Sequence, residues 1–599
     1  MTVYISRVHI ENFRNFHELD VSLAEKAVIV GENGAGKTNF IHALRLILDP
    51  DLPDSARRLK EDDFWDGLEA PMQNGTEITI SIDLQGFESN ESLLAILSDY
   101  IVDVGEHPSA RITYKYMPLP DLGAGNGNSE EPKYDFVIYG GSDPTNIFGY
   151  QQRKWMPLQM LPALRDAEAD LESWRRSPLR PLVDRLKVAR EDLEEAAGKI
   201  QDATNALVDT EEIRLLSTDI EKRLEDMVGQ FHSVSPSLGI ASTDALRLLR
   251  SLRIFVDGER QRAIGDTSLG ICNVLYLTLL VLELERKEAA GERACTILAI
   301  EEPEAHLHPH LQRLVYHDFL RRESCLLLTT HSPHIVSVSP LRSVVLLRDY
   351  GITTGSKATS TVKAVFNDAE VQDLERYLDA TRAEMLFARG VILVEGDAER
   401  YVVPAVSGFP LDQRGISICS VQGTDFAPYC KLLGQQSLGI PFVVITDGDP
   451  YSVEGTQIYR GVQRATGLLR LQNPEVASQL DALSEHWVAV RKRLGEFGIY
   501  LSDHELEIDL ANSGNGKRML TTLEELGSGP KRRSKFETAL SKAPDLSEKE
   551  IMEIMRIIEI YGKGRFAQRL ASKLDEATAP KYIKQAIRHL VKAMDGGGK

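Results

Sequence analysis

The stretch GENGAGKT, residues 31–38, decides the fold of the first half of the chain. It matches the pattern G-x-x-x-x-G-K-[ST] at every fixed position. The apolar run AVIV precedes it, and the helix-like run TNFIHALRLIL includes its last residue and continues beyond it. Glycines let backbone amides surround phosphate oxygens, and the start of a helix adds a favourable dipole. The segment therefore predicts a nucleotide phosphate-binding loop between a strand and a helix of an α/β fold.

Each residue type in this loop has an expected role. Lys37 is expected to reach the β- and γ-phosphates of ATP, and the Thr38 hydroxyl is expected to bind Mg²⁺. The flexible remainder of the loop is expected to contact phosphate oxygens through its backbone. The predicted nucleotide contacts in the loop are Gly31, Asn33, Gly34, Gly36, Lys37 and Thr38.

A second segment, TILAIEEPEAHLHP, supplies the carboxylates that an ATP-bound magnesium ion needs. Glu301 follows a buried-strand pattern and takes the place of the usual aspartate as a magnesium ligand. Glu302 is positioned to polarise the attacking water. His331 ends the next strand-like run, LLLTTHSPH, where it is suited to sensing the γ-phosphate.

A separate set of acids lies farther along the chain. VILVEGDAERYVV places Glu395 after a strand and Glu399 four residues later, a spacing that shares one helical face. VVITDGDP places Asp447 and Asp449 at another strand end, on alternate residues that point the same way when the chain is extended. These oxygen ligands suit Mg²⁺ or Mn²⁺, and no Cys/His spacing suggests zinc.

Bulk properties limit the classes of protein that fit. A chain of 599 residues is expected to form two to four domains, and its 42% apolar and 26% charged content is typical of globular proteins. The net charge of −20 argues against non-specific coating of nucleic acid, although KRRSK at 531–535 could contact phosphates or be a solvated loop. No apolar run suits a membrane span, no secretory signal is visible and the five cysteines show no paired spacing, so a cytoplasmic location without membrane contact is expected.

The ATPase motifs resemble those of the ATP-binding-cassette (ABC) ATPases, in the subgroup close to chromosome-maintenance and recombination proteins, and the opening ISRVHIENFRNF is similar to theirs. In that subgroup ATP lies between two heads, and a signature motif comes from the partner head. The matching stretch here is GDTSLGICNVLYLTLL, with Ser268 and Gly270 as the implied nucleotide contacts, and it departs from the common Leu-Ser-Gly-Gly form. A homodimer or higher homo-oligomer follows from this resemblance.

The second acid set resembles the Toprim domain of topoisomerases, primases and some nucleases. An ABC head followed by a Toprim domain is the architecture of the overcoming lysogenization defect (OLD) family of ATP-associated endonucleases, and this resemblance covers nearly the whole chain. It implies further acidic ligands from YLSDHELEIDL, most plausibly Glu507 with Asp509 second, and an assisting lysine, best matched by Lys563. The ligands implied are Glu395, Asp447, Asp449 and Glu507, with Glu399 as ligand or neighbour.

The resemblance and the strand–helix pattern together predict the architecture. The expected parts are an N-terminal ATPase lobe over residues 1–164, a helical insertion for dimerisation over 165–250, a second ATPase lobe over 251–380 and a Toprim domain over 381–599. The helical block shows no sustained heptad, so short packed helices are expected rather than a long coiled coil. A helical subdomain of the core is an equal interpretation of that block.

The function implied is hydrolysis of double-stranded DNA by two metal ions, with ATP gating the cut. One metal would lower the pKa of the attacking water, the other would stabilise the leaving 3′-oxygen, and Lys563 would neutralise charge at the phosphate. The alternatives are a topoisomerase-like strand-passage factor and a DNA-binding recombination or repair clamp. The resemblance suggests antiphage defence, either alone or, as in Gabija systems, with a helicase encoded beside it.

Overall fold

The computed structural model describes residues 3–119, 132–162, 166–208, 210–228, 249–250, 252–256, 262–322, 325–453, 456–481 and 487–596. The Gly/Asn/Ser-rich loop predicted at 123–132 lies, apart from Pro132, outside these residues. Within them, no helix combines the length and apolarity that a membrane span requires. The chain divides into two compact units, of which the first comprises residues 1–163, 294–304 and 309–599, and the second comprises 164–293 and 305–308.

The glycine-rich loop of residues 31–38 belongs to a six-stranded sheet of the first unit, in the order β14-β13-β3-β12-β11-β8. Its strands from β13 to β8 are parallel, and only β14 runs antiparallel to its neighbour. Runs of buried apolar residues form the central strands, as expected where both faces of a sheet are covered. The strands are β3 (Lys26–Gly31), β8 (Leu158–Leu161), β11 (Ile297–Glu301), β12 (Cys325–Thr330), β13 (Val344–Asp349) and β14 (Ser356–Ser360).

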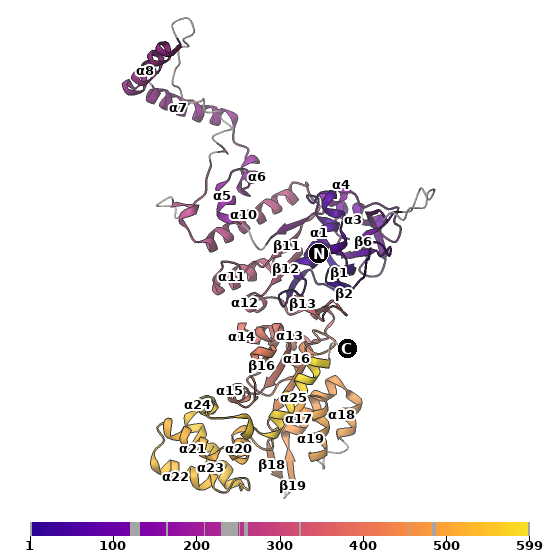
Figure 1. Cartoon of the computed structure of the whole chain (residues 1–599), viewed down its shortest axis with the longest axis vertical. Coiled ribbons are helices and arrows are strands. Elements are labelled where there is room, and N and C mark those ends of the chain that lie inside the picture. The colour runs from indigo at the N-terminus through magenta and orange to yellow at the C-terminus, as the bar shows by residue number, and fades with distance from the viewer. Residues whose placement is uncertain are drawn as a thin grey trace. The chain divides into compact units, whose positions relative to one another are not determined.

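The second sheet is antiparallel. Its strands lie in the order β2-β1-β4-β6-β5, and β7 also pairs with β6. Helix α1 (Lys37–Leu48) contacts β3 and β8 as well as β4 and β6, so it lies between the two sheets (Figure 1). Phe40, Leu44 and Ile47 on α1 are completely buried in the core that the two sheets share. The antiparallel strands are β1 (Tyr4–Phe13), β2 (Phe16–Ser22), β4 (Ile78–Gln85), β5 (Ile101–Asp103), β6 (Ser109–Pro118) and β7 (Tyr134–Gly140).

The C-terminal part of the first unit contains a four-stranded, fully parallel sheet in the order β16-β15-β17-β20. The strands are β15 (Gly390–Val394), β16 (Ile416–Ser420), β17 (Phe442–Thr446) and β20 (Ile499–Leu501). The strand runs expected at GVILVEGD, GISICSVQG and PFVVITDGD are confirmed. The C-terminal helix α25 (Lys581–Gly596, yellow in Figure 1) packs across β15, β17 and β20.

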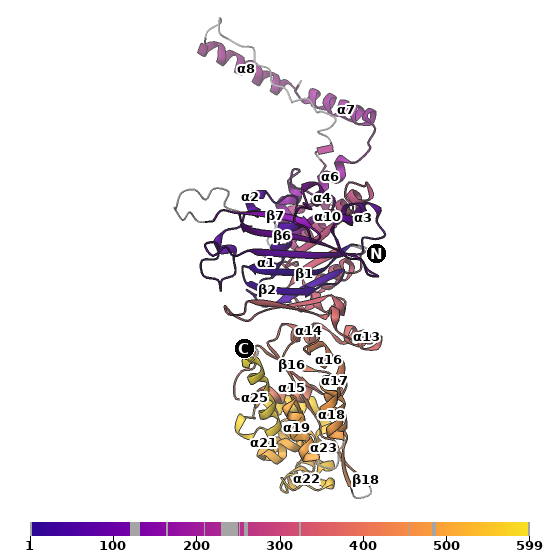
Figure 2. The ribbon, with the colours of Figure 1, turned by 90° about the vertical axis from the view of Figure 1, so that its right-hand side faces the viewer.

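Helices surround this sheet and complete its core (Figure 2). Helix α15 (Asp397–Ala405) follows β15 directly and packs against α24 (Lys563–Ala571). The hairpin of β18 (Pro450–Val453) and β19 (Thr456–Tyr459) separates β17 from α17 (Arg460–Gln472). Further helices are α16 (Ala427–Leu433), α18 (Pro474–Asp481), α19 (Trp487–Glu496), α20 (Leu506–Leu510), α21 (Gly516–Glu525), α22 (Pro530–Leu540) and α23 (Glu548–Tyr561).

The basic run at 531–535 corrects one expectation, because it lies in a helix and not in a loop. Helix α22 begins at Pro530, immediately after Gly529, so KRRSK forms its first turns. Proline at the first helical position has its backbone angle already set for a helix and lacks only an amide that would be unpaired there. Glycine followed by proline therefore marks the start of a helix at this site rather than a long turn.

The second unit is helical, with α10 (Leu269–Ala289) packed against α5 (Ala167–Glu172) and α6 (Leu179–Asp184). Helices α7 (Arg190–Val208) and α8 (Glu211–Val228) follow one another along the chain (Figure 1). Over the described part of this region, α7 and α8 are separate helices of 19 and 18 residues, longer than the short packed helices expected. The mixed α/β fold class, an ATPase head followed by a second parallel sheet, is confirmed.

Candidate functional site

The nucleotide loop has the backbone shape that phosphate binding requires. Gly34 and Gly36 have φ angles of 84° and 97°, a conformation that glycine adopts without strain. A Cβ atom at Gly36 would stand 2.0 Å from Nδ2 of Asn15. Asn15 Nδ2 also donates to the Ala35 carbonyl at 3.0 Å, so the β1–β2 turn supports the loop from one side.

Lys37 lies buried under the loop that it is predicted to serve. Its Nζ donates to the carbonyls of Gly31 and Glu32, each at 3.1 Å. Burial lowers the pKa of Lys37, and the carboxylates of Glu302 and Glu304 oppose that shift. The ammonium therefore lies near two carboxylates at the start of α1, and both this ammonium and the N-terminus of the helix favour a bound phosphate.

The acids expected to serve ATP hydrolysis follow adjacent parallel strands. Glu301 ends β11, where burial raises its pKa against a hydrogen bond from the Thr38 side chain, and its Oε1 is buried without a hydrogen-bond partner among the described residues. Glu302 has a φ of 40°, which is strained for a non-glycine residue and typical of functional positions. Its Oε1 lies 3.4 Å from Nε2 of His331. The structure thus brings Thr38, Glu301, Glu302 and His331 into one region.

Glu304 was not identified from the sequence, although it belongs to the same EEPE motif. Its Oε1 accepts from the backbone N–H of His331 at 2.6 Å and its Oε2 accepts from Thr330 Oγ1 at 2.9 Å. Glu304 therefore fixes the turn that presents His331. The signal available in the sequence was the third acid after the paired glutamates.

A cavity of about 360 Å³ extends from this region along α1. Thr38 and Glu301 line it together with Gln159 of β8 and with Arg14, neither of which was singled out from the sequence. Burial and the nearby Arg14 and Arg45 lower the pKa of His42, which also lines the cavity, to about 4. The imidazole is therefore neutral in the physiological range.

The two signature-like residues lie in the second unit, at the start of α10. The side chain of Ser268 caps this helix by accepting from the Ile271 N–H, and Gly270 is buried in its first turn. A Cβ atom at Gly270 would stand 2.9 Å from the carbonyl oxygen of His306. Their nucleotide role stays a prediction.

The second acid set is organised by the parallel strands of the C-terminal sheet. β17 pairs with β15 on one side and with β20 on the other, so the carboxyl ends of all three strands lie along one edge. Glu395 follows β15, Asp447 follows β17 and Ser502 follows β20. In parallel α/β sheets this edge is where ligands bind.

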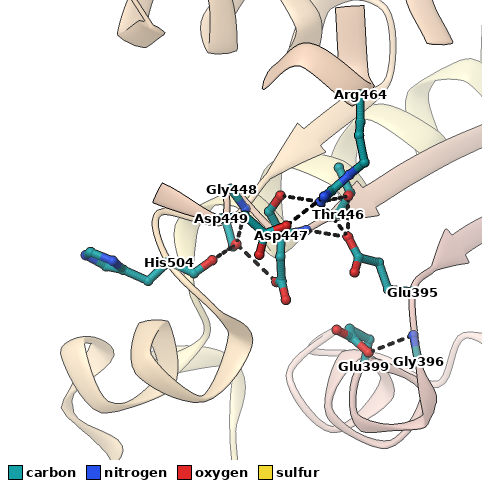
Figure 3. Close-up of polar contacts among 10 residues, drawn as sticks. Glu395, Gly396, Glu399, Thr446, Asp447, Gly448, Asp449, Arg464 and His504 are labelled. Carbon is teal, nitrogen blue, oxygen red and sulfur yellow. Dashed lines mark hydrogen bonds and ion pairs between the residues drawn. The ribbon is translucent and has the colours of Figure 1, made fainter. Parts of the chain in front are cut away.

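Glu395 is held rigidly by three donors that converge on its Oε1 (Figure 3). Thr446 Oγ1 and the backbone N–H of Asp447 donate to it, the latter at 2.8 Å. Arg464 Nη2 is the third donor, at 3.2 Å. The carboxylate is therefore oriented before any cation binds.

Asp447 lies among the charges of four other carboxylates in the cluster. Burial raises its pKa well above the usual range, and the charges of Glu395, Glu399, Glu507 and Asp449 raise it further. Its Oδ1 accepts from Ser502 Oγ at 3.1 Å. Four neighbouring carboxylates at one aspartate mean that negative charge in this cluster is not fully compensated.

Asp449 and Glu399 complete the two strand-end motifs. Asp449 has a φ of 45°, a strained conformation, and its Oδ2 accepts from Arg464 Nη1 at 2.7 Å. Glu399 caps the start of α15, because its Oε2 accepts from the Gly396 N–H at 3.1 Å. Burial, together with Glu395, raises the pKa of Glu399 against the nearby Lys563.

Three acids of YLSDHELEIDL, Glu505, Glu507 and Asp509, have different partners because residues 506–510 form helix α20. Burial raises the pKa of Glu507 to about 7, and the charges of Glu399 and Glu505 add to this against the nearby Lys563. Glu505 pairs with Lys563 instead, at 2.6 Å. Asp509 Oδ2 accepts from the Asp503 N–H at 2.7 Å, and burial raises the pKa of Asp509 to about 7 against the charge of Arg491. The carboxylate of Asp509 therefore binds the backbone of the turn at Asp503.

The donor set fits a divalent cation of the magnesium type. Carboxylate oxygens from Glu395, Asp447 and Glu507 are hard ligands, and Glu507 Oε1 is buried without a hydrogen-bond partner among the described residues. The raised pKa values of Asp447 and Glu507 report unbalanced negative charge that a cation would neutralise. No group of three His, Cys, Asp or Glu side chains within the described ranges is already gathered as a metal site, so ligation requires side-chain movement.

Two residues of this cluster escaped the sequence argument. Arg464 lies on α17, fifteen positions beyond Asp449 and after the β18–β19 hairpin, so no local spacing connects them. Ser502 is one residue past β20, and strand-end position was its only signal. Of the residues predicted, the electrostatic neighbours in the structure are Glu395, Glu399, Asp447, Asp449, Glu507 and Lys563.

Known protein families match both the N-terminal and the C-terminal part of the chain. The family described as "Overcoming lysogenization defect protein-like, TOPRIM domain" matches residues 386–449. The family described as "AAA ATPase domain" matches residues 3–103 and 179–336. The Toprim match begins before Glu395 and ends at Asp449, so it includes both strand-end acid motifs.

Individual relatives extend over most of the chain. The OLD nuclease of Thermus scotoductus (strain ATCC 700910 / SA-01) is 25% identical over 75% of this chain and 83% of its own length. Endonuclease GajA of Bacillus cereus (strain VD045) is 24% identical over 84% of this chain and 89% of its own. The solved C-terminal region of the Burkholderia pseudomallei OLD protein is 36% identical, with a TM-score of 0.31, over 35% of this chain and 99% of that region.

Proposed function

The chain belongs to the overcoming lysogenization defect (OLD) family, and on that basis we propose that it is an ATP-binding, divalent-metal-dependent endonuclease of double-stranded DNA. The observation that carries the proposal is the convergence of carboxylates from the ends of two parallel strands, β15 and β17, and from helix α20. Asp447 lies within reach of four other carboxylate charges, and burial raises its pKa well above the usual range. Such clusters are a frequent feature of metal-dependent phosphodiesterase sites.

We assign different roles in the reaction to different side chains of the cluster. Glu395, Asp447, Asp449 and Glu507 would hold Mg²⁺ or Mn²⁺, with Glu399 as a ligand or neighbour. When bound, the cations supply Lewis acidity and neutralise charge on the DNA phosphate. Thr446 and Ser502 orient Glu395 and Asp447 through their hydroxyls.

Lys563 is a positively charged side chain near Glu505, Glu507 and Asp447. Its ammonium pairs with Glu505, and the charges of Glu507, Glu505 and Asp447 raise its pKa although burial lowers it. The lysine therefore stays protonated and can neutralise charge that develops on the phosphate. Asp509 is a secondary candidate, because its carboxylate already binds the backbone of Asp503.

The ATPase half is proposed to license the cut. Lys37, the loop glycines and Asn33 would bind the phosphates, while Thr38 and Glu301 would hold magnesium. Glu302 would polarise the attacking water and His331 would sense the γ-phosphate. Ser268 and Gly270 would complete the site of a second copy, which makes a homodimer or higher homo-oligomer the proposed assembly.

Hydrolysis fits the site better than the tyrosine chemistry of a topoisomerase-like factor. Tyr582 lies beside the acids on α25, but its side chain is buried, and burial with Asp509 and Asp447 raises its pKa well above the usual value. A nucleophilic tyrosine needs the opposite electrostatic environment. A clamp without cleavage activity would not need the buried, charge-rich cluster around Asp447.

The deciding experiment incubates the full-length protein with supercoiled plasmid, Mg²⁺ or Mn²⁺, and with or without ATP. Nicked or linear product that requires metal and is lost in Asp447→Asn supports the proposal. Relaxed covalently closed circles would support strand passage, and unchanged plasmid under every condition would support a clamp. The same reactions show whether ATP activates or restrains cutting.

Antiphage defence is the proposed biological setting, because the resemblance to the OLD family suggests it, and one relative of this chain is named endonuclease GajA. The test is to challenge cells that carry the gene with phage, using Asp447→Asn as the inactive control. Addition of a helicase gene found beside it would reveal a two-component system. Equal phage growth with wild type and variant in both settings would refute the defence role.

A further inference from the structure

Arg464 places a permanent positive charge inside the acid cluster. It lies on α17, and Figure 3 shows its guanidinium between the side chains of Asp449 and Glu395. Nη1 donates to Asp449 Oδ2 at 2.7 Å, and Nη2 lies 3.2 Å from Glu395 Oε1. An arginine side chain stays charged at any accessible pH, so this group neutralises the carboxylates without exchanging a proton.

The same guanidinium also touches the strand end that joins the two acids. Nη2 donates to the Asp447 carbonyl at 3.0 Å and lies 3.3 Å from Thr446 Oγ1. Arg464 thus links the end of β15 to the segment that follows β17. Without it, Glu395 and Asp449 would face each other across the cluster with no cation between them.

The hydrogen bonding of Arg464 is incomplete, whereas a structural arginine usually has a partner for every buried donor. Its Nε is buried and has no hydrogen-bond partner among the described residues. The side chain is 24% exposed, so it has access to solvent on one side. A buried donor without a partner weakens the hold of the protein on this rotamer.

Arg464 and a divalent cation would require the same carboxylates. The guanidinium occupies Asp449 Oδ2 and one side of Glu395, both predicted metal ligands. None of the contacts in the described residues joins Glu395 Oε2, so one oxygen remains for an incoming cation while Arg464 is bound. Complete ligation by both acids requires the arginine to withdraw, since two cations in contact would repel each other.

We propose that Arg464 is a built-in counter-cation that holds Glu395 and Asp449 in the metal-free enzyme and competes with the divalent cation for them. This inference rests on the proposed metal site and adds a residue that sets its affinity. Arg464 is thus a positioning residue, because it acts through the two carboxylates. The competition keeps the acids assembled before metal arrives and raises the metal concentration needed for activity.

The test measures binding of Mn²⁺ alone to the full-length protein, by the loss of the free-ion electron paramagnetic resonance signal, at one pH. Arg464→Met removes the charge and keeps an unbranched, flexible side chain that replaces the aliphatic stem. It is expected to bind Mn²⁺ about tenfold more tightly than wild type, the order expected when one close competing charge is removed. Its metal-free melting temperature should fall, and Mn²⁺ should raise that temperature by more than it does in wild type.

Unchanged or weaker Mn²⁺ binding in Arg464→Met would overturn the proposal and leave Arg464 as a structural link. Arg464→Lys keeps the charge but loses the two-pronged geometry, so its affinity should lie between those of wild type and Arg464→Met. If Arg464→Met does not fold, an affinity of Arg464→Lys no higher than that of wild type overturns the proposal. Arg470→Met, which removes an exposed arginine from the last turn of the same helix, should match wild type.

Failure of the proposed function gives a different result. If wild type binds no Mn²⁺ and Asp447→Asn behaves identically, the metal site itself is refuted, and this inference falls with it. If wild type binds Mn²⁺, Asp447→Asn loses it and Arg464→Met is unchanged, only the role of Arg464 is refuted.

Discussion

Nζ of Lys563 lies 2.6 Å from Oε2 of Glu505, a contact between the first residue of α24 and the residue that precedes α20. The packing of α24 against α15 places the same lysine near Glu399, and its positive charge opposes the rise that burial causes in the pKa of Glu507. Lys563 is thus a charge shared among several carboxylates, with Glu505 as its direct partner.

Replacement of Lys563 by methionine should lower the rate of DNA cutting by about 10²–10³-fold, because one preorganised cation is lost from the reacting phosphate. Initial rates of plasmid nicking in Mg²⁺ measure the effect. Lys573→Met is the matched control, since Lys573 also forms a lysine–glutamate pair, with Glu525 at 2.7 Å, but on the surface outside the acid cluster. Equal rates in Lys563→Met and Lys573→Met would remove Lys563 from the mechanism.

Mutations should affect ATP binding and DNA cutting separately. Asp447→Asn is expected to abolish DNA cutting while ATP binding stays at the wild-type level, because the partners that Asp447 has among the described residues belong to the C-terminal sheet region. Lys37→Ala is expected to abolish ATP binding, since it removes the ammonium beneath the phosphate loop. Nucleotide binding measured by equilibrium dialysis, beside plasmid cutting, checks both. An Asp447→Asn protein that no longer binds ATP would contradict this division.

Glu302→Gln should retain ATP binding but lower the rate of ATP hydrolysis by about 10²–10³-fold, since the amide cannot accept a proton from water. The rate of phosphate release under saturating ATP is the measurement. Glu69→Gln, an exposed glutamate, serves as the control for loss of one carboxylate. Hydrolysis at the wild-type rate in Glu302→Gln would assign the water-polarising role elsewhere.

Stability of the metal-free protein should depend on pH through Glu507. Burial raises the pKa of Glu507 from 4.5 to about 7 in the folded state, so its contribution to stability is complete below pH 4.5 and is lost as the pH rises through 7. Glu507→Gln cannot ionise and avoids this loss. At pH 8 the variant should therefore be more stable than wild type by about 1–3 kcal/mol.

Thermal unfolding in the presence of a chelator, from pH 4.5 to pH 8, measures this difference. The gap between Glu507→Gln and wild type should open as the pH rises and close when Mn²⁺ is added to wild type. Glu537→Gln removes an exposed carboxylate from α22 and should follow the wild-type curve. A gap that is constant across the pH range would show that the change acts through packing and not through ionisation.

Much of the fold was predictable because its elements depend on local patterns. Apolar runs such as KAVIVG and FVVIT predicted the buried parallel strands β3 and β17, and the glycine-rich loop predicted the start of α1. The charge of the basic run at 531–535 suggests a loop, but the Gly-Pro pair directly before it begins helix α22. At this position the backbone preference of glycine followed by proline predicted the structure better than the charge of the segment did.

The candidate sites were predictable where the ligand residues follow a strand directly. Glu301, Glu395 and Asp447 each follow a run of buried apolar residues, and parallel strands in one sheet bring their carboxyl ends together. The acids of YLSDHELEIDL were harder to separate, because their two-residue spacing does not reveal that α20 turns Glu507 and Asp509 toward different partners.

The sequence by itself determined the two chemistries of this protein, because a phosphate loop and strand-end acids are short motifs whose geometry is set within a few residues. Only the tertiary structure decided which charges balance them. Arg464 reaches Asp449 and Glu395 across a hairpin, and Lys563 reaches Glu505 from a helix 58 positions away. Electrostatic interactions act through space and depend on burial, so no spacing along the chain could reveal these partners.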